Sequence, residues 1–173
     1  MGMEVGQDPE RLREAVKAAK EGCSIPVIAK LSPNITPTSL TEVARAAESA
    51  GADAISATNT VLGVVGINVE TGVPIPCLEN KQGKPQSVFS GISGPAIKPL
   101  SLRCVAQIAQ AVKIPISGIG GITDWSSAVE FMMVGARTVQ VGTAAMVFGH
   151  GIIRKLTSGL EQFMTRKGYK SLD

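Results

Sequence analysis

The chain has 173 residues, about the length of one domain, and 44% of them are hydrophobic, which is enough to fill a core. Aromatic residues make up only 3%, which argues against an aromatic-rich β-sandwich and favours helices packed on a buried parallel sheet. The net charge of +3 comes from scattered lysines and arginines apart from a small cluster at Arg166, Lys167 and Lys170, so nucleic acid is not an expected partner. With no basic-then-apolar leader and no apolar run of about 20 residues, we expect a cytoplasmic protein with no membrane partner.

Helix-start signals occur early in the chain. Asp8 is placed as an N-cap with Pro9 at the first helical position, and Thr36-Pro37 repeats the device before a helix that runs to about Ala50. Gly51 follows where a left-handed residue ends a helix. Two further helices are predicted to begin near residues 99 and 124.

Four short runs rich in Val and Ile predict strands at 27–31, 52–57, 114–119 and 138–141. Most strand starts lie about 24 to 26 residues apart, but the second and third are separated by about 62. The segment 60–98 is therefore predicted to be an insertion, and its sequence GINVETGVPIP indicates a β-hairpin or a lid.

Alternating strands and helices predict an α/β fold, either a doubly wound sheet or a closed eight-unit barrel. The position of the glycine-rich turns favours the barrel, because many β/α barrels bind phosphate after strands seven and eight. Here the turns at 118–121 and 142–143 follow the last two strands. We therefore predict the C-terminal half of a (β/α)8 TIM barrel, with residues 1–173 forming units five to eight of one partial domain.

The two glycine-rich turns are candidates for a phosphate site. Gly120 and Gly121 let backbone amides approach an anion, and the helix that starts near Asp124 is expected to add its positive end. Gly142 and Thr143 end the next strand at the same mouth. Each turn alone fits a plain loop, but two at consecutive strand ends favour shared phosphate binding.

Polar side chains at the other two strand ends allow two interpretations each. Lys30 lies in an apolar strand, where it either faces an anionic or electron-rich ligand or points outward between helices. Thr58, Asn59 and Thr60 end the next strand, and an Asn amide can match the C=O and N–H edge of a pyrimidine or simply form a turn. Asn34 is interpreted as a turn or helix cap.

The remaining reactive residues indicate no catalytic group. His150, the one histidine, has no acid or nucleophile partner that the sequence identifies, so we expect a structural or surface role. Cys23, Cys77 and Cys104 lie far apart without metal-ligand spacing, which predicts structural thiols in a reducing compartment and no metal site.

Five motifs, AKLSPN, SATNT, SGISGPAIKP, GIGGI and QVGTAAM, occur in this order along nearly the whole chain. They resemble the FMN barrels of class-one dihydroorotate dehydrogenases and of dihydropyrimidine dehydrogenases. The segments GIGGITDW, VEFMMVGARTVQVGTAAMVFGHGI and GLEQFMTRKGYKSL are most similar to the flavin subunits of bacterial NAD-dependent dihydropyrimidine dehydrogenases.

The resemblance implies a role for particular residues of this chain. Lys30 matches the lysine that contacts the isoalloxazine ring, and Asn59 and Thr60 match contacts to the pyrimidine substrate. The positions that match FMN contacts, the last four of them mainly around the phosphate, are Gly94, Ile119, Gly120, Gly121, Gly142 and Thr143.

The resemblance also implies FMN-dependent reduction of uracil or thymine to 5,6-dihydropyrimidines, by hydride exchange between flavin N5 and pyrimidine C6. Proton transfer at C5 is expected from a cysteine in a loop upstream of Met1, so this chain is expected to supply no catalytic residue. Electrons are expected from NAD(P)H through a partner domain or subunit that holds FAD and iron–sulfur clusters.

Two alternatives remain at this point: a dihydroorotate dehydrogenase, and a non-catalytic half-barrel that binds flavin or phosphate. Four strands of a barrel leave two unpaired edges and an apolar inner face, which predicts assembly with the N-terminal barrel half or an oligomer. We expect the chain alone to be inactive.

Overall fold

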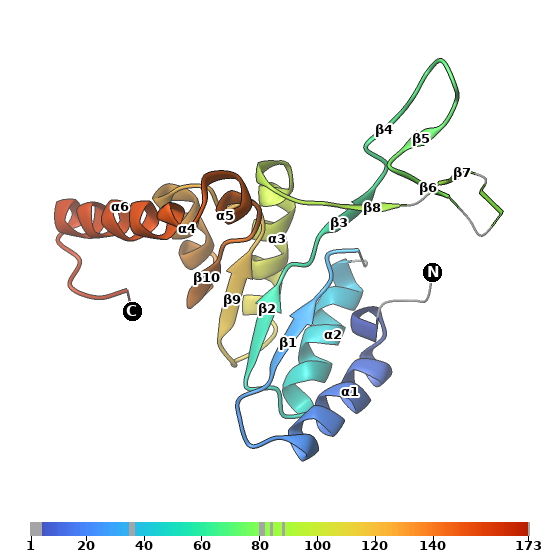
Figure 1. Cartoon of the computed structure of the whole chain (residues 1–173). Coiled ribbons are helices and arrows are strands. Elements are labelled where there is room, and N and C mark those ends of the chain that lie inside the picture. Colours follow the sequence, from blue (N-terminus) through green and yellow to red (C-terminus); the bar gives the residue numbers. More distant parts are fainter. Residues whose placement is uncertain (1–4, 35–36, 80–81, 84, 88, 173) are drawn as a thin grey trace.

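The computed structural model describes residues 5–34, 37–79, 82–83, 85–87 and 89–172. Its centre is a four-stranded parallel sheet in the order β1-β2-β9-β10 (Figure 1). The strands are β1 (Ile28–Leu31), β2 (Ala54–Ala57), β9 (Ile116–Ile119) and β10 (Thr138–Gln140). All four predicted strands are present, each a little shorter than the apolar run that predicted it.

Helices alternate with these strands along the chain. They are α1 (Pro9–Gly22), α2 (Pro37–Ser49), α3 (Lys98–Ala109), α4 (Trp125–Met133), α5 (Thr143–Phe148) and α6 (Gly151–Lys167). The α/β class is confirmed, and this alternation around a parallel sheet is the arrangement of part of a (β/α)8 barrel.

The predicted helix ends are present where the structure describes them. The carboxylate of Asp8 accepts hydrogen bonds from the amides of Glu10 (2.9 Å) and Arg11 (3.2 Å), as an N-cap does. Gly51 has a φ of +93°, the left-handed conformation that ends α2. The cap predicted at Thr36 lies outside the described residues. The helix predicted near residue 99 begins at Lys98, after a 3-10 turn at Pro95–Ile97.

The core lies between the sheet and the helices α2, α3 and α4. In β1, Ala29 and Leu31 are buried while Ile28 and Lys30 are exposed, so alternate residues face the helices and the open inner face. Phe131 of α4 is fully buried, and its ring packs so closely on Gly118 of β9 that a Cβ there would lie 2.6 Å from the ring. Small residues in the strands therefore let the helices approach closely.

An arm of antiparallel strands leaves the sheet after β2 and returns before α3 (Figure 1, upper right). The predicted hairpin in GINVETGVPIP is present as β4 and β5, and the described residues of the insertion form three strand pairs rather than one. The pairs are β3 (Val61–Gly63) with β8 (Ser90–Ile92), β4 (Gly66–Ile67) with β5 (Pro74–Ile75), and β6 (Cys77–Glu79) with β7 (Pro85–Ser87).

Asn34 fastens the base of this arm to the end of β1. Its Nδ2 donates to the carbonyl of Thr60 (3.0 Å), and its Oδ1 accepts from the amide of Leu62 (2.8 Å). Asn34 was predicted to cap a turn or a helix, and its side chain instead joins the loop after β1 to the start of the arm. Farther along the arm, apolar side chains such as Val69 and Phe89 are exposed.

The C-terminal helix α6 packs on α4 through an aromatic group. Trp125 lies 5.4 Å from Phe163, and Phe163 lies 6.0 Å from Tyr169, measured between ring centroids. Gly159 lies against Trp125, where a Cβ would clash with the indole at 2.3 Å. In the described part of the chain, no helix is both long and apolar enough to cross a membrane.

Candidate functional site

A cavity of about 250 Å³ opens at the carboxyl ends of the four parallel strands. All nine residues that the sequence singled out for cofactor or substrate contacts line it: Lys30, Asn59, Thr60, Gly94, Ile119, Gly120, Gly121, Gly142 and Thr143. Segments that are far apart in sequence are thus brought to one mouth, where ligands of β/α barrels bind. The structure adds other lining residues, among them Ser93, Gln140 and Met146.

The loop after β9 packs against the segment that leads into α3. Gly120 has a φ of +132°, and a Cβ there would lie 2.0 Å from the hydroxyl of Ser101, which is fully buried. A Cβ on Gly121 would lie 2.9 Å from the carbonyl oxygen of Gly94 and 3.0 Å from the amide nitrogen of Lys98. The glycines therefore bring two loops together without intervening side chains.

The loop after β10 joins the same group. The hydroxyl of Thr143 donates to the hydroxyl of Ser93 (2.9 Å), and the Thr143 side chain lies beside Gly94. A Cβ added to Gly142 would meet no atom within 4 Å, so this glycine faces open space. We call these three loops, at residues 93–94, 120–121 and 142–143, the glycine cradle.

Backbone amides of the cradle are available to a ligand. Those of Gly120, Gly121, Gly142 and Thr143 make no hydrogen bond to another residue in the described part of the chain. Convergent free amides without obstructing side chains form an anion-binding concavity. The cradle has the donors that a phosphate requires.

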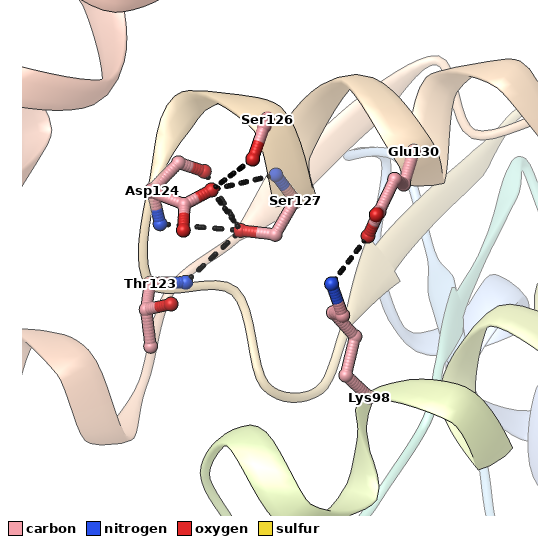
Figure 2. Close-up of polar contacts among 6 residues, drawn as sticks. All are labelled: Lys98, Thr123, Asp124, Ser126, Ser127 and Glu130. Atoms are coloured by element: carbon pink, nitrogen blue, oxygen red, sulfur yellow. Dashed lines mark hydrogen bonds and ion pairs between the residues drawn. The ribbon is translucent and has the colours of Figure 1, made fainter.

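One sequence expectation about this phosphate site stays a prediction. Helix α4 was predicted to offer its positive end, and Figure 2 shows the capping box that lies there. The carboxylate of Asp124 accepts from the amide of Ser127 (2.8 Å), while the Ser127 hydroxyl accepts from the amides of Thr123 (3.2 Å) and Asp124 (3.1 Å). This capping box pairs the amide of Ser127 and places a negative charge at the helix start, which weakens the attraction of this helix end for an anion.

The charge on Asp124 is stabilised by its surroundings. The hydrogen bond from the Ser127 amide is the main cause that lowers the pKa of this carboxyl, with the hydroxyls of Ser126 and Ser127 and the cation of Lys98 adding to it. Asp124 therefore stays ionised as the cap of α4.

The floor of the cavity is a polar layer on the inner face of the sheet. Lys30 pairs in register with Ser56, and Ser56 with Ser117. The side-chain amide of Gln140 reaches across two strands and donates to the hydroxyls of Ser56 and Ser117, both at 2.9 Å. Sequence reasoning missed Ser56, Ser117 and Gln140 on this face. These residues could have been found from the sequence, because polar residues in otherwise apolar strands alternate with apolar ones and so share one face of the sheet.

Asn59 and Thr60 lie half-buried at the rim, above the polar floor. The amide of Asn59 donates to the carbonyl of Leu31 (3.0 Å), which fixes this strand end beside β1. Thr58 is buried and its hydroxyl shares a hydrogen bond with that of Ser101 (3.0 Å), so it connects β2 to α3. Of the predicted cluster Thr58, Asn59 and Thr60, only Thr58 is buried, and the other two are partly exposed at the rim of the cavity.

The histidine and the cysteines do not line the cavity. His150 is exposed and precedes α6 as its N-cap position. Cys23 is exposed at the end of α1, and Cys77 lies in β6. Cys104 is buried in α3, and this burial raises the pKa of its thiol. None of these four side chains is placed to act on a ligand in the cradle.

Comparison with known proteins agrees with this arrangement. The family model described as dihydroorotate dehydrogenase matches residues 1–164. The chain belongs to the dihydroorotate dehydrogenase family. The family relationship agrees with the resemblance seen in the motifs, and this family comprises flavoprotein oxidoreductases of pyrimidine metabolism with a TIM-barrel fold.

Curated relatives in the family carry two different names. The chain is 43% identical to the catalytic subunit of dihydroorotate dehydrogenase B (NAD(+)) from Pyrococcus abyssi, over 99% of this chain and 53% of that protein. The protein of the same name from Thermococcus kodakarensis is 44% identical over the same shares. The NAD-dependent dihydropyrimidine dehydrogenase subunit PreA of Escherichia coli is 40% identical over 99% of this chain and 41% of that protein. The chain thus spans about half the length of these relatives.

Proposed function

We propose that this chain forms the wall of an FMN site that holds the phosphate, in an oxidoreductase that acts on the C5–C6 bond of a pyrimidine ring. The observation that carries the proposal is the convergence of the three loops of the glycine cradle with Lys30 and Asn59 in one cavity. Family membership supports the same cofactor and reaction class.

The residues present fit FMN. The free amides of Gly120, Gly121, Gly142 and Thr143 match the oxygens of a phosphate, and Gly142 leaves the space that a side chain would fill. Gly94 and Ile119 complete the lining toward the ring. These residues would hold the cofactor, which in its bound form supplies hydride transfer to or from C6 of the pyrimidine.

The other residues of the cavity have distinct tasks in this proposal. Lys30 lies on the inner face of the sheet and lines the cavity, where its ammonium would stabilise negative charge on a bound flavin ring. Asn59 and Thr60 offer donors and acceptors at the rim for the pyrimidine edge. In the described part of the chain Lys30 is the only titratable residue that lines the cavity, so we propose that the C5 proton is exchanged with a cysteine outside these 173 residues.

Two pyrimidine substrates are supported by different observations. The SATNT strand end, the long insertion and the GYKSL tail favour uracil or thymine, reduced to the 5,6-dihydropyrimidine. The names of the relatives from Pyrococcus abyssi and Thermococcus kodakarensis favour dihydroorotate. We propose the dihydropyrimidine reaction and take dihydroorotate as the second candidate. A non-catalytic flavin or phosphate carrier is the third.

The unpaired edges and exposed inner face of the sheet indicate that this chain needs partners. In the described part of the chain, β1 and β10 each pair on one side only, and Ile28 on the inner face is 56% exposed. We propose that residues 1–173 act as units five to eight of a barrel whose other half covers this face, within an oligomer. Electrons would come from NAD(P)H through a partner domain or subunit with FAD and iron–sulfur clusters.

The test is a reconstitution. We expect the 173-residue chain alone to bind FMN weakly and to turn over neither uracil nor dihydroorotate. Fused behind the preceding barrel half of the Pyrococcus abyssi relative, it should bind FMN and gain activity with an artificial electron acceptor or donor. Lys30→Ala should abolish that activity, whereas Lys113→Ala, an exposed lysine outside the cavity, should leave it unchanged.

The outcomes separate the candidates. Turnover of dihydroorotate alone would exclude the dihydropyrimidine reaction. FMN binding without turnover of either substrate would leave the non-catalytic carrier, and robust uracil reduction by the chain alone would contradict the placement of the acid or base elsewhere.

A further inference from the structure

An ion pair joins two helices beside the glycine cradle. The ammonium of Lys98, the first residue of α3, lies 2.6 Å from the carboxylate of Glu130, in the last turn of α4. Figure 2 shows Lys98 extending from the start of α3 toward Glu130 on α4. Both side chains are partly exposed, at 31% and 45%.

The polarity of this pair opposes both helices. A helix carries partial positive charge at its first turn and partial negative charge at its last turn. Lys98 nevertheless begins α3, whose first turn has no acidic residue, and Glu130 lies near the end of α4, whose last turn has no basic residue. The reverse arrangement, with the acid on α3 and the base on α4, would favour both helices and keep the ion pair.

The signs of these two charges lower the stability of both helices. Residues that are unfavourable for local structure in this way are found at functional sites, which suggests a functional reason for the pair. Lys98 is well placed for one. Its Cβ and amide nitrogen lie 2.8 Å and 3.0 Å from the position that a Cβ on Gly121 would take, so the residue lies directly behind a loop of the cradle. Glu130 contacts the ammonium of Lys98 from α4.

The neighbouring charges agree with this placement. The one other carboxylate that interacts with Lys98 among the described residues is that of Asp124, and its Oδ1 already accepts hydrogen bonds within the cap of α4. Of the two charges in the pair, the cation is the one carried by the residue that packs on the cradle.

We propose that the polarity of the Lys98–Glu130 pair serves the anion in the glycine cradle: Lys98 attracts the phosphate, and Glu130 balances the charge of the lysine from α4. This inference rests on the proposed phosphate site and adds a charge determinant that contacts neither the ring nor the reacting atoms.

The charge-swapped variant Lys98→Glu with Glu130→Lys tests it. The swap keeps the ion pair and suits both helix ends, so resistance to urea should be equal to wild type or higher. Affinity for FMN and for inorganic phosphate, measured by calorimetry on the 173-residue chain, should fall about tenfold because the nearby charge changes sign. Affinity for riboflavin, which lacks the phosphate, should stay within about twofold of wild type.

Glu130→Gln supplies the contrast. It removes the carboxylate and keeps the cation, so phosphate and FMN affinity should stay equal or rise, with a steeper loss of affinity as salt is added. If the pair were only a clamp, the swap would retain affinity and Glu130→Gln would lose it, which overturns the inference.

Failure of the flavin proposal looks different from failure of this inference. Wild-type chain that binds inorganic phosphate but neither FMN nor riboflavin would contradict the flavin site, while loss of phosphate binding in the swap would still support the inference. Wild type and swap with equal phosphate affinity would overturn the inference whatever FMN does, and so would a wild-type chain that binds no phosphate.

Discussion

Gly142→Ala separates ligand binding from folding. The added methyl group would meet no atom within 4 Å, and the φ of Gly142 is −109°, so a side chain there does not require a left-handed backbone. Because the ψ of Gly142, −85°, lies outside the usual helical range, we expect the free energy of unfolding to fall by about 1 kcal/mol or less. The methyl would instead occupy the space where the proposed phosphate meets the amides of Gly142 and Thr143. Loss of one charge-assisted hydrogen bond costs roughly 1.5–3 kcal/mol, which is about 10- to 100-fold in Kd.

The assay is a calorimetric titration with FMN alongside urea unfolding of the same preparations. Gly22→Ala is the matched control, because its methyl also meets no atom within 4 Å but lies at the end of α1, outside the cavity. It should leave FMN affinity unchanged. A Gly142→Ala protein that is as stable as wild type and binds FMN equally well would refute the assignment of the cradle.

Three further predictions concern stability, each measured by urea unfolding. Gly120→Ala should cost about 2 kcal/mol or more, because φ is +132° and the new Cβ would lie 2.0 Å from the hydroxyl of Ser101; an unchanged midpoint would contradict this packing. Phe131→Ala should cost about 3–5 kcal/mol, since the fully buried ring fills the space over Gly118; a loss below 1 kcal/mol would show that the core is elsewhere. Asp124→Asn keeps the cap but not its charge. Because the pKa of Asp124 is lowered on folding, its charge stabilises the fold above about pH 4 and this contribution is lost as the pH falls through the folded value. The variant should be less stable than wild type at pH 7, the difference should shrink as the pH falls below about 4, and a difference that does not change with pH would refute the linkage.

Much of the fold could be predicted because its signals are local. Asp8 with Pro9, and Gly51 after α2, mark helix ends by chemistry that acts within a few residues. The spacing of the strands located the arm after β2. The number of strand pairs in the arm could not be predicted, because pairs such as β3–β8 join residues that are distant in sequence.

Site residues at the ends of predicted strands could be predicted from the sequence. Hydrogen bonds between strands could not, because they depend on the order of the strands in the sheet. Lys30 and Gly142 stand at the ends of predicted strands, so their meeting in one cavity follows from a parallel sheet. The bond from Gln140 to Ser56, two strands away, depends on the order β2-β9-β10. The capping box at Asp124 had a local signal in Asp124 and Ser127, and it places a carboxylate at the start of α4.

The central claim is that the glycine cradle binds the phosphate of FMN, and amide chemical shifts of the 15N-labelled chain test it most directly. On titration with FMN, the amides of Gly120, Gly121, Gly142 and Thr143 should shift most, and riboflavin should move them much less. The amide of Gly22 should stay in place with both. If the largest shifts instead fall on α4 and α6, or if FMN and riboflavin give the same pattern, the cradle is not the phosphate site.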